Sequence, residues 1–205
     1  MKVAVIDDDQ SVRSSLTRAL KTAGIEVASF SSAHEFLDDP CLNQIDCAVT
    51  DVRMPGIDGL ALQELLAQTQ PNLSLVFITG EGDIPMGITA MKRGAVDFLE
   101  KPVDRKALLE AVHRAAERSR DKKISRAEVD DLRRRYELLT PRERQVFQLV
   151  TTGLLNKQAS VELGTSEQTI KVHRARVMIK MDAKSLAELV RMADQLHVRP
   201  ASKAD

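Results

Sequence analysis

The pattern of apolar and polar positions changes character near the middle of the chain. Over residues 1–118, short apolar runs alternate with segments in which apolar residues recur every three or four positions. Short continuous runs are typical of buried strands, and the longer period is typical of amphipathic helices. Their alternation predicts repeated βα units, and therefore an α/β fold with a five-stranded parallel sheet doubly wound by helices. The predicted strands cover 3–6, 26–30, 47–50, 73–78 and 97–100.

Capping and breaking residues delimit five helices between these runs. The expected starts are Ser11, Ser32, Gly59, Asp83 and Asp104, and the expected ends include Gly24, Pro40, Gln68 and Lys92. The fourth helix contains Pro85 and Gly87, each of which is costly inside a helix. A marginal helix is a candidate moving part.

A charged segment, 119–138, follows and contains no proline or glycine. We interpret it as a linker that continues as a helix and carries a sparse apolar stripe. The stripe consists of Ile124, Val129, Leu132 and Tyr136. Such a stripe can pair with another chain as a coiled coil, or the segment can be a solvated connector, and the sequence leaves both readings open.

Residues 139–200 have the pattern of an all-α domain of four helices. Thr140, Pro141 and Glu143 form a strong helix start, because they supply a cap, a proline at the first helical position and a capping-box glutamate. The later caps are expected at Asn156, Ser166 and Ser185, and the first three helices are expected to end at Thr151 or Thr152, Leu163 and Met181. A short helix, a turn at Gly164 and a longer basic helix are typical of a helix-turn-helix.

The formal net charge of zero hides an uneven distribution of charge along the chain. Residues 1–104 contain 8 Lys and Arg against 16 Asp and Glu, whereas residues 105–205 contain 22 against 14. The basic half is therefore expected to meet a polyanion, and the acidic half is not.

The two cysteines, Cys41 and Cys47, are too few for a disulfide framework and lack the spacing of a metal site. The sequence contains no run of about 20 apolar residues and no signal-type segment. We therefore expect a soluble protein of the reducing cytoplasm that does not associate with a membrane.

Chemically active side chains follow four of the predicted strands. Asp7 and Asp8 follow the first, Asp51 follows the third, Thr79 the fourth and Lys101 the fifth. The carboxyl ends of parallel strands meet at one edge of an open α/β sheet, where ligands gather. Clustered carboxylates favour Mg²⁺ (or Mn²⁺), which would let Asp51 act as a nucleophile toward phosphorus. Lys101 then supplies a positive charge, and Thr79 a hydroxyl, for the phosphoryl oxygens.

Residues 1–118 resemble the receiver domain of bacterial two-component response regulators. The resemblance rests on Asp7-Asp8, on Asp-Val-Arg-Met-Pro-Gly-Ile-Asp-Gly from Asp51 onward, on Thr79 and on Lys101-Pro102. It implies a flavodoxin-like sheet with strand order 2-1-3-4-5. It also implies that Asp51 is the phosphoacceptor, assisted by Lys101 and Thr79. The extra acid Asp9 is expected to be a cap or a surface residue.

The same resemblance implies a metal site and a switch. The implied metal ligands are Asp51, Asp8 directly, Asp7 through water, and Arg53 through its backbone carbonyl. Thr79 and Phe98 would form the switch pair, in which the hydroxyl moves to the phosphoryl group and the ring turns inward. The alternative is that Phe98 is simply a core residue. The Lys101–Pro102 bond would be cis, as an X-Pro bond can be.

The third helix of the basic half has two faces of different chemistry. Ile170, His173, Val177 and Met181 share one face, and Gln168, Lys171, Val172 and Ala175 share the opposite one, flanked by Arg174 and Arg176. This arrangement suits a helix in the major groove of DNA, where central residues reach base edges and flanking arginines hold phosphates.

The stretches 139–144, 153–159 and 169–174 resemble the LuxR-type DNA-binding domain, and its pairing with a receiver resembles the FixJ/NarL group, FixJ in particular. The resemblance implies base contacts by Lys171 and Val172. One departure is Ala159-Ser160, where family members usually place Ile-Ala. The smaller residue predicts slightly looser helix packing.

Together these features predict a phosphorylation-controlled transcription factor. A sensor histidine kinase would phosphorylate Asp51. Two receivers would then pair through the face formed by the fourth helix, fifth strand and fifth helix, and the homodimer would bind promoter DNA and meet RNA polymerase. No enzymatic turnover is expected beyond a slow self-dephosphorylation.

Two rival functions belong to other classes. An aspartyl-phosphate enzyme of the haloacid dehalogenase type needs a second acid two residues after its nucleophile, and Arg53 stands there. A receiver that only binds proteins and is never phosphorylated usually lacks an acidic, threonine or lysine position, and all are present here. The sequence leaves open whether the unphosphorylated receiver blocks the DNA-binding half or merely fails to dimerise.

Overall fold

The structure is a computed structural model that describes residues 1–80 and 84–198. The chain forms two compact units, Met1–Lys123 and Ile124–Asp205. The expected helix start at Asp83, and residues 199–200 of the expected DNA-binding segment, lie outside the described residues.

The first unit is built on a five-stranded sheet in which every neighbouring pair is parallel. The strand order is β2-β1-β3-β4-β5. The strands are β1 (Lys2–Ile6), β2 (Glu26–Phe30), β3 (Cys47–Asp51), β4 (Ser74–Thr79) and β5 (Asp97–Glu100). This confirms the doubly wound α/β fold and the strand order expected from the sequence.

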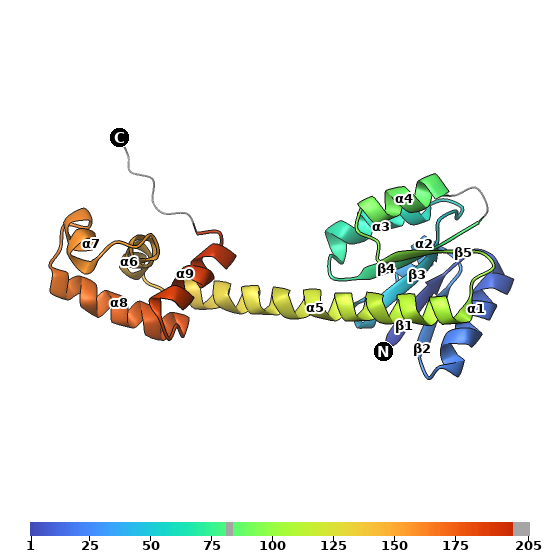
Figure 1. Cartoon of the computed structure of the whole chain (residues 1–205), viewed down its shortest axis with the longest axis horizontal. Helices are drawn as coiled ribbons and strands as arrows, with labels where there is room; N and C mark the ends of the chain where they lie inside the picture. The colour runs from blue at the N-terminus through green and yellow to red at the C-terminus, as the bar shows by residue number, and fades with distance from the viewer. Residues whose placement is uncertain (81–83, 199–205) are drawn as a thin grey trace. The chain divides into compact units, whose positions relative to one another are not determined.

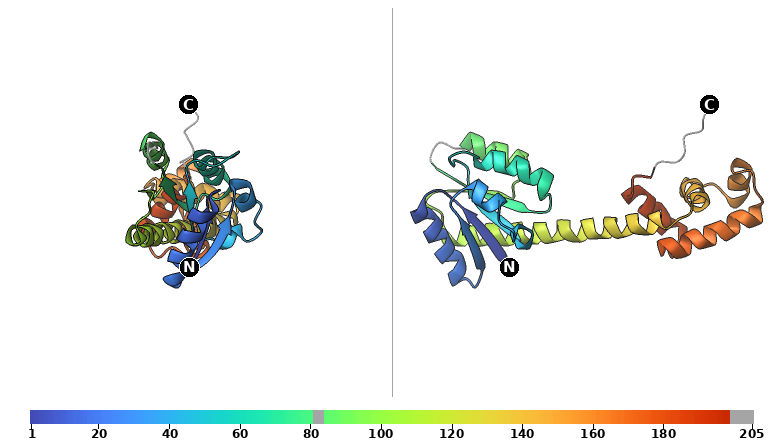
Figure 2. Two further views of the ribbon diagram at one scale, coloured as in Figure 1. Left: turned by 90° about the vertical axis from the view of Figure 1, so that its right-hand side faces the viewer. Right: turned by 180° about the vertical axis from the view of Figure 1, so that it is seen from behind.

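Helices cover both faces of this sheet (Figure 1). On one face lie α1 (Gln10–Thr22) and the part of α5 (Arg105–Glu137) that belongs to the first unit. On the other face lie α2 (Ala33–Leu37), α3 (Gly59–Thr69) and α4 (Ile84–Lys92). The same arrangement of helices around the sheet is seen in the two further views of Figure 2. A short 3-10 helix, Leu42–Gln44, precedes β3.

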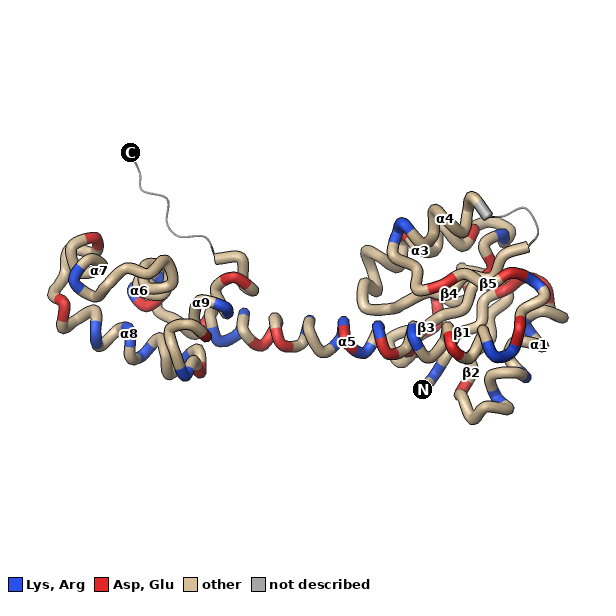
Figure 3. Tube along the Cα trace, in the orientation of Figure 1, with Lys and Arg blue, Asp and Glu red and all other residues tan. Residues whose placement is uncertain are grey.

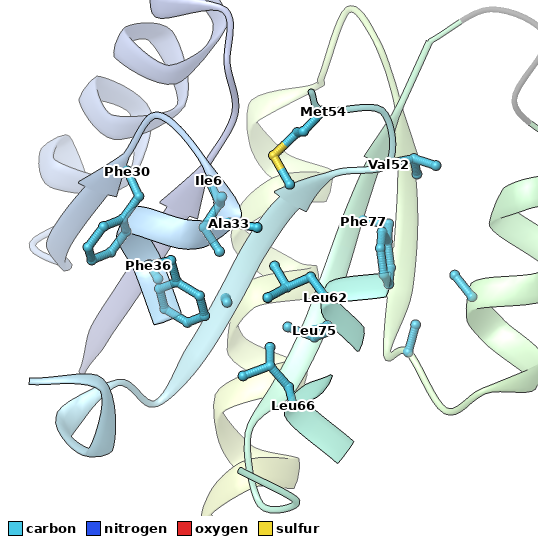
Figure 4. Packing of buried hydrophobic residues seen from close by; sticks show 14 of the residues in the cluster. Ile6, Phe30, Ala33, Phe36, Val52, Met54, Leu62, Leu66, Leu75 and Phe77 are labelled. Atoms are coloured by element: carbon cyan, nitrogen blue, oxygen red, sulfur yellow. The ribbon is translucent and has the colours of Figure 1, made fainter. Parts of the chain in front are cut away.

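Alternate residues of the central strands fill two separate cores, one on each side of the sheet. In β4, Leu75 and Phe77 point to the side of α2, α3 and α4, whereas Val76 and Ile78 point to the side of α1 and α5. Figure 4 shows the first of these cores, in which Phe77 and Leu75 pack near Leu62 of α3. Because both faces of the strands are buried, their sequences read as continuous apolar runs.

Two predicted caps are corrected by the structure. Helix α1 is capped by Asp9, whose Oδ1 accepts from the backbone N–H of Ser11 at 2.7 Å and of Val12 at 3.3 Å. Ser11 therefore lies inside the helix, because the preceding carboxylate can reach two free N–H groups at once. Asn156 is the first residue of its helix and not the cap, and its side chain is bonded elsewhere.

The second unit contains the four predicted helices, together with the C-terminal part of α5. They are α6 (Pro141–Thr151), α7 (Asn156–Glu162), α8 (Glu167–Met181) and α9 (Leu186–Gln195). Thr140 caps α6 with a full capping box, as the sequence predicts. Their apolar faces meet in one core, which includes Val146, Phe147, Ile170, Val177 and Leu189.

The apolar stripe of the charged segment contributes to this core. Leu132 is buried in it, and the ring of Tyr136 packs edge-on against Phe147 with 5.2 Å between the ring centroids. Ile124 is exposed. The end of the stripe thus stabilises the second unit itself, which neither the coiled-coil reading nor the solvated-connector reading had anticipated.

Among the residues that the structure describes, no helix combines the length and apolar character that crossing a membrane requires.

Candidate functional site

Three carboxylates meet at the carboxyl edge of the sheet in the first unit. Strand β1 lies next to β3, with Ile6 opposite Thr50, so the residues that follow these two positions are neighbours. Asp7, Asp8 and Asp51 each offer an oxygen, and these oxygens all lie within 4.8 Å of one another. The two strand ends thereby bring together acids that are 43 residues or more apart in the sequence.

Lys101 places a positive charge among these acids. Its Nζ lies 2.6 Å from Oδ2 of Asp51 and 3.1 Å from Oδ2 of Asp7. The backbone N–H of Lys101 also donates to the carbonyl of Thr79 at 2.8 Å, which holds the end of β5 beside the end of β4. Thr79 is buried at this edge, and the Lys101–Pro102 bond is cis, as expected.

The protonation of Asp7 and Lys101 is coupled at this edge. Burial raises the pKa of Asp7, and the Lys101 hydrogen bond opposes that rise only in part. Burial alone would lower the pKa of Lys101, but its hydrogen bonds to Asp51 and Asp7 outweigh this and raise it. Asp7, Asp8 and Asp51 offer a cluster of hard carboxylate oxygens. Such a donor set fits a divalent cation of the Mg²⁺ type.

Backbone and side-chain donors fix the acidic loop. The backbone N–H of Asp9 donates to Oδ1 of Asp7 at 2.8 Å, and that of Arg53 donates to Oδ1 of Asp51 at 3.3 Å. The Arg13 guanidinium donates through Nη1 to the carbonyl of Asp7 at 2.6 Å. Sequence reasoning missed Arg13, since an arginine one turn into a helix carries no signal of a loop contact.

Gly59 allows α3 to begin directly against Asp51. A Cβ at this position would lie 2.4 Å from the carbonyl oxygen of Asp51 and 2.9 Å from Cε1 of Phe77. The N–H of Gly59 donates to the carbonyl of Val52 at 2.9 Å. Any side chain would therefore displace the loop that carries Asp51. The motif ends in Gly59, and this contact explains why a glycine is required there.

Phe98 lies between the sheet and α4. It pairs in register with Phe77, and Thr79 lies two residues further along β4, so all three side chains point to the same face of the sheet. The ring of Phe98 is half-buried and packs against the backbone of Gly87, where an added Cβ would lie 3.2 Å from its Cδ2. Gly87 is unfavourable inside a helix, but its lack of a side chain leaves room for the Phe98 ring.

In the second unit, α8 has the two faces that the sequence predicts. Ile170, Val177 and Met181 are buried and His173 is partly buried. The opposite face, exposed to solvent, carries Gln168, Lys171, Val172, Ala175 and Arg176. Lys and Arg recur along this helix (blue in Figure 3), and Lys171 and Arg176 are exposed while Arg174 is partly exposed.

The three basic residues of this surface differ in how they are held. Lys171 lies 3.3 Å from Glu167 in an exposed pair. Arg174 is partly buried and donates through Nη1 to Oδ1 of Asn156 at 3.1 Å. Arg176 makes no hydrogen bond or ion pair within the described part of the chain. Arg174 is therefore tethered, whereas Arg176 is not.

An ion pair between a partly exposed lysine and a buried carboxylate joins α8 to α6. Nζ of Lys180 lies 2.6 Å from Oε2 of Glu143 and donates to the carbonyl of Leu138 at 3.0 Å. Burial alone would raise the pKa of Glu143, but the hydrogen bonds from Lys180 and Thr140 outweigh it and lower the pKa. Sequence reasoning identified Glu143 only as part of a cap and missed Lys180, which is 37 residues away.

Two family models match the chain, one for each unit. The response regulator receiver domain matches residues 3–113, and the luxR family of bacterial regulatory proteins matches residues 137–193.

Full-length relatives share the same combination. Nodulation protein W of Bradyrhizobium diazoefficiens is 47% identical over 196 residues, which are 96% of this chain and 86% of that protein. The transcriptional regulatory protein FixJ of Azorhizobium caulinodans is 44% identical over 204 residues, covering 100% of this chain and 97% of that protein.

Solved structures agree. The response regulator StyR gives a TM-score of 0.79 at 44% identity and covers 95% of this chain and 98% of its own. Full-length FixJ from B. japonicum gives a TM-score of 0.57 at 42% identity, with 96% and 97% covered. The chain therefore belongs to the two-component response regulators of the FixJ/NarL group, in which a receiver domain is joined to a luxR-family DNA-binding domain.

Proposed function

We propose that Asp51 accepts a phosphoryl group from a phosphohistidine of a sensor kinase. An oxygen of Asp51 attacks phosphorus, the phosphorus–nitrogen bond breaks, and the imidazole leaves with a proton from solvent. The observation that carries the proposal is the position of the Asp51 carboxylate, 2.6 Å from the Lys101 ammonium and within 4.8 Å of the carboxylates of Asp7 and Asp8. Lys101 and the Thr79 hydroxyl would hold the oxygens of the transferred group.

We further propose that this edge binds Mg²⁺ or Mn²⁺. Asp51 and Asp8 would hold the ion directly, Asp7 through water, and Arg53 through its backbone carbonyl. When bound, the ion offsets the negative charge of the carboxylates and of the phosphoryl oxygens. The cluster of carboxylate oxygens from Asp7, Asp8 and Asp51 supports this assignment.

Phosphorylation would be read by the face that includes α4 and β5. The Thr79 hydroxyl would move toward the phosphoryl group, and the Phe98 ring would turn inward behind it. Ile88 and Met91 of α4 are exposed apolar residues, 48% and 38% accessible, which suits a surface that becomes covered in a homodimer.

The dimer would place two DNA-binding units on adjacent half-sites of promoter DNA. Gln168, Lys171, Val172 and Ala175 would reach base edges, and Arg174 and Arg176 would contact phosphates. At a promoter the protein would meet RNA polymerase, and its place of action would be the cytoplasm. The names of the relatives, which include response regulators and transcriptional regulatory proteins, support this role.

The phosphoryl step can be tested by intact mass. The full chain is incubated with acetyl phosphate and Mg²⁺, and one phosphoryl mass is expected on the wild type and on Asp38→Asn, an acid outside the site, but not on Asp51→Asn. Omitting Mg²⁺ should greatly reduce the added mass. A time course after removal of acetyl phosphate measures the expected slow self-dephosphorylation. If the wild type gains no mass, the reading as an unphosphorylated interaction module takes its place.

The switch can be tested on the same samples. Phosphorylated wild type should sediment as a dimer and bind promoter DNA more tightly than the unphosphorylated protein, whereas Asp51→Asn should show neither change. A phosphorylated protein that stays monomeric and binds DNA no better would rule out the dimerisation mechanism, even if Asp51 is the phosphoacceptor.

A further inference from the structure

Helix α7 buries very little of its own surface. It has seven residues, and its buried side chains are those of Ala159 and Ser160. Its cap residue is Leu155, which has no side-chain acceptor for the free N–H groups of the first turn. A helix this short is marginal without tertiary support. Its orientation against α8 must therefore depend on other contacts.

Two arginines from the neighbouring helices hold the two ends of α7. At its C-terminal end, Arg142 of α6 donates through Nη2 to the carbonyl of Leu163 at 2.5 Å, where a cation also suits the helix dipole. At its N-terminal end, Arg174 of α8 donates through Nη1 to Oδ1 of Asn156 at 3.1 Å. The helix dipole does not favour a cation at that end, so the stability of α7 alone does not account for the second contact.

We propose that Asn156 is a positioning residue for DNA binding, which holds the Arg174 guanidinium at the junction of α7 and α8 for contact with a DNA phosphate. The inference rests on the proposed DNA-binding function. A guanidinium carries five N–H donors, and the bond to Asn156 uses one of them. The others are available to a phosphate, which arginine binds in a planar, directed geometry.

The advantage of this tether is the entropy that it removes before binding. A free arginine side chain loses rotamer freedom when it contacts a phosphate, and this loss weakens binding. Arg174 is already partly buried and bonded, whereas Arg176 on the same helix is exposed and untethered. The two arginines thus form a matched pair within one surface.

The test measures binding of the full chain, treated with acetyl phosphate and Mg²⁺, to a 30-base-pair duplex of mixed sequence over a series of salt concentrations. Phosphate contacts do not depend on base sequence, so the operator is not needed. Arg174→Ala should weaken binding and lower the slope of log K against log salt by about one. Asn156→Ala should weaken binding by about 2- to 10-fold, the range expected for losing the ordering of one side chain.

Double variants separate positioning from a merely structural role. In the Arg174→Ala background, Asn156→Ala should have almost no further effect, whereas in the Arg176→Ala background it should weaken binding by its full factor. If Asn156→Ala instead disturbs α7, it will weaken binding equally in both backgrounds, and the inference is overturned. A wild type that does not bind the duplex even at low salt would instead overturn the proposed DNA-binding function. If the wild type binds the duplex and Asn156→Ala binds it equally well, the positioning role of Asn156 is overturned and the proposed DNA-binding function is not.

Discussion

Each unit of the protein contains a lysine ammonium 2.6 Å from a carboxylate, and the two pairs differ in their surroundings. Lys101 faces Asp51 at the edge of the sheet, where Asp7 and Asp8 add two further negative charges. Lys180 faces Glu143 between two helices, where the remaining partners are the carbonyl of Leu138 and the backbone N–H of Thr140.

The difference distinguishes a lysine–carboxylate pair that stabilises the fold from one that belongs to a candidate reactive site. Around Glu143, donors and charges balance, and its pKa is lowered despite burial. Around Asp7, burial raises the pKa, the hydrogen bond from Lys101 opposes the rise only in part, and the charge of Asp51 adds to it. The first arrangement stabilises a fold, whereas the second is a cluster of carboxylate oxygens of the kind that a divalent cation binds. The same pair of residue types thus serves structure in one unit and chemistry in the other.

The largest effect on the stability and reactivity of either unit is expected from Gly59→Ala, because this substitution acts on the backbone that holds Asp51. The added methyl would lie 2.4 Å from the Asp51 carbonyl oxygen, so the loop and the start of α3 must move apart. We expect a loss of about 3 kcal/mol of receiver stability and no phosphorylation of Asp51 by acetyl phosphate. Hydrogen exchange of peptides from each unit measures the stability, and unchanged exchange in the receiver would contradict this steric argument.

The next largest effect is expected from Lys180→Met. It leaves the buried Glu143 carboxylate without its cation, which should cost the second unit about 2–3 kcal/mol, somewhat below the cost for a fully buried pair because Lys180 is partly exposed. The matched control is Lys184→Met, on an exposed lysine. Hydrogen exchange of peptides from α6 and α8 should increase only in the first variant. Equal effects of the two variants would show that the Lys180–Glu143 pair does not stabilise the second unit.

A smaller effect is expected from pH, with opposite signs in the two units. The pKa of Glu143 is lowered, so its contribution is present above its ordinary value of 4.5 and is lost as pH falls through the folded value. The pKa of Asp7 is raised, so the folded receiver is favoured at low pH, and this advantage is lost as pH rises from 3.8 through the folded value.

Urea unfolding without divalent cations, compared at pH 4 and pH 7 for each unit, measures both contributions. Asp7→Asn should remove the receiver's part of the pH difference, and Glu143→Gln should remove that of the second unit. The same sign in both units would contradict the proposed contrast between the two lysine–carboxylate sites.

The smallest effect is expected from Gly87→Ala, which concerns the packing of α4 against Phe98. Replacing a glycine inside a helix by alanine normally stabilises it by about 1 kcal/mol, but here the methyl would lie 3.2 Å from the Phe98 ring. We expect no net gain of stability in the wild type and a gain of about 0.5–1 kcal/mol in the Phe98→Ala background. Urea denaturation of the wild type, the two single variants and the double variant measures the difference. An equal gain in both backgrounds would show that the contact between Gly87 and Phe98 does not offset the gain from alanine.

Much of the fold was predictable because its signals are local. The three central strands, β1, β3 and β4, contain short apolar runs, and the capping box at Thr140 is complete within four residues. The errors were also local in origin. Asp9 and Ser11 can both cap a helix, and the backbone path places Asp9 at the cap position of α1. Asn156 is a suitable cap by residue type, but it is the first residue of α7 and its side chain accepts from Arg174.

The order of the elements, the division of charge between the halves and the identity of the acids follow from the sequence, because each depends on period, composition or a short motif. The folded chain was needed to show that Lys180 meets Glu143, why Gly59 and Gly87 carry no side chain, and how Arg174 is held. Those facts depend on distances between segments far apart in the chain, such as Lys180 and Glu143, which become neighbours only when α6 and α8 pack against each other.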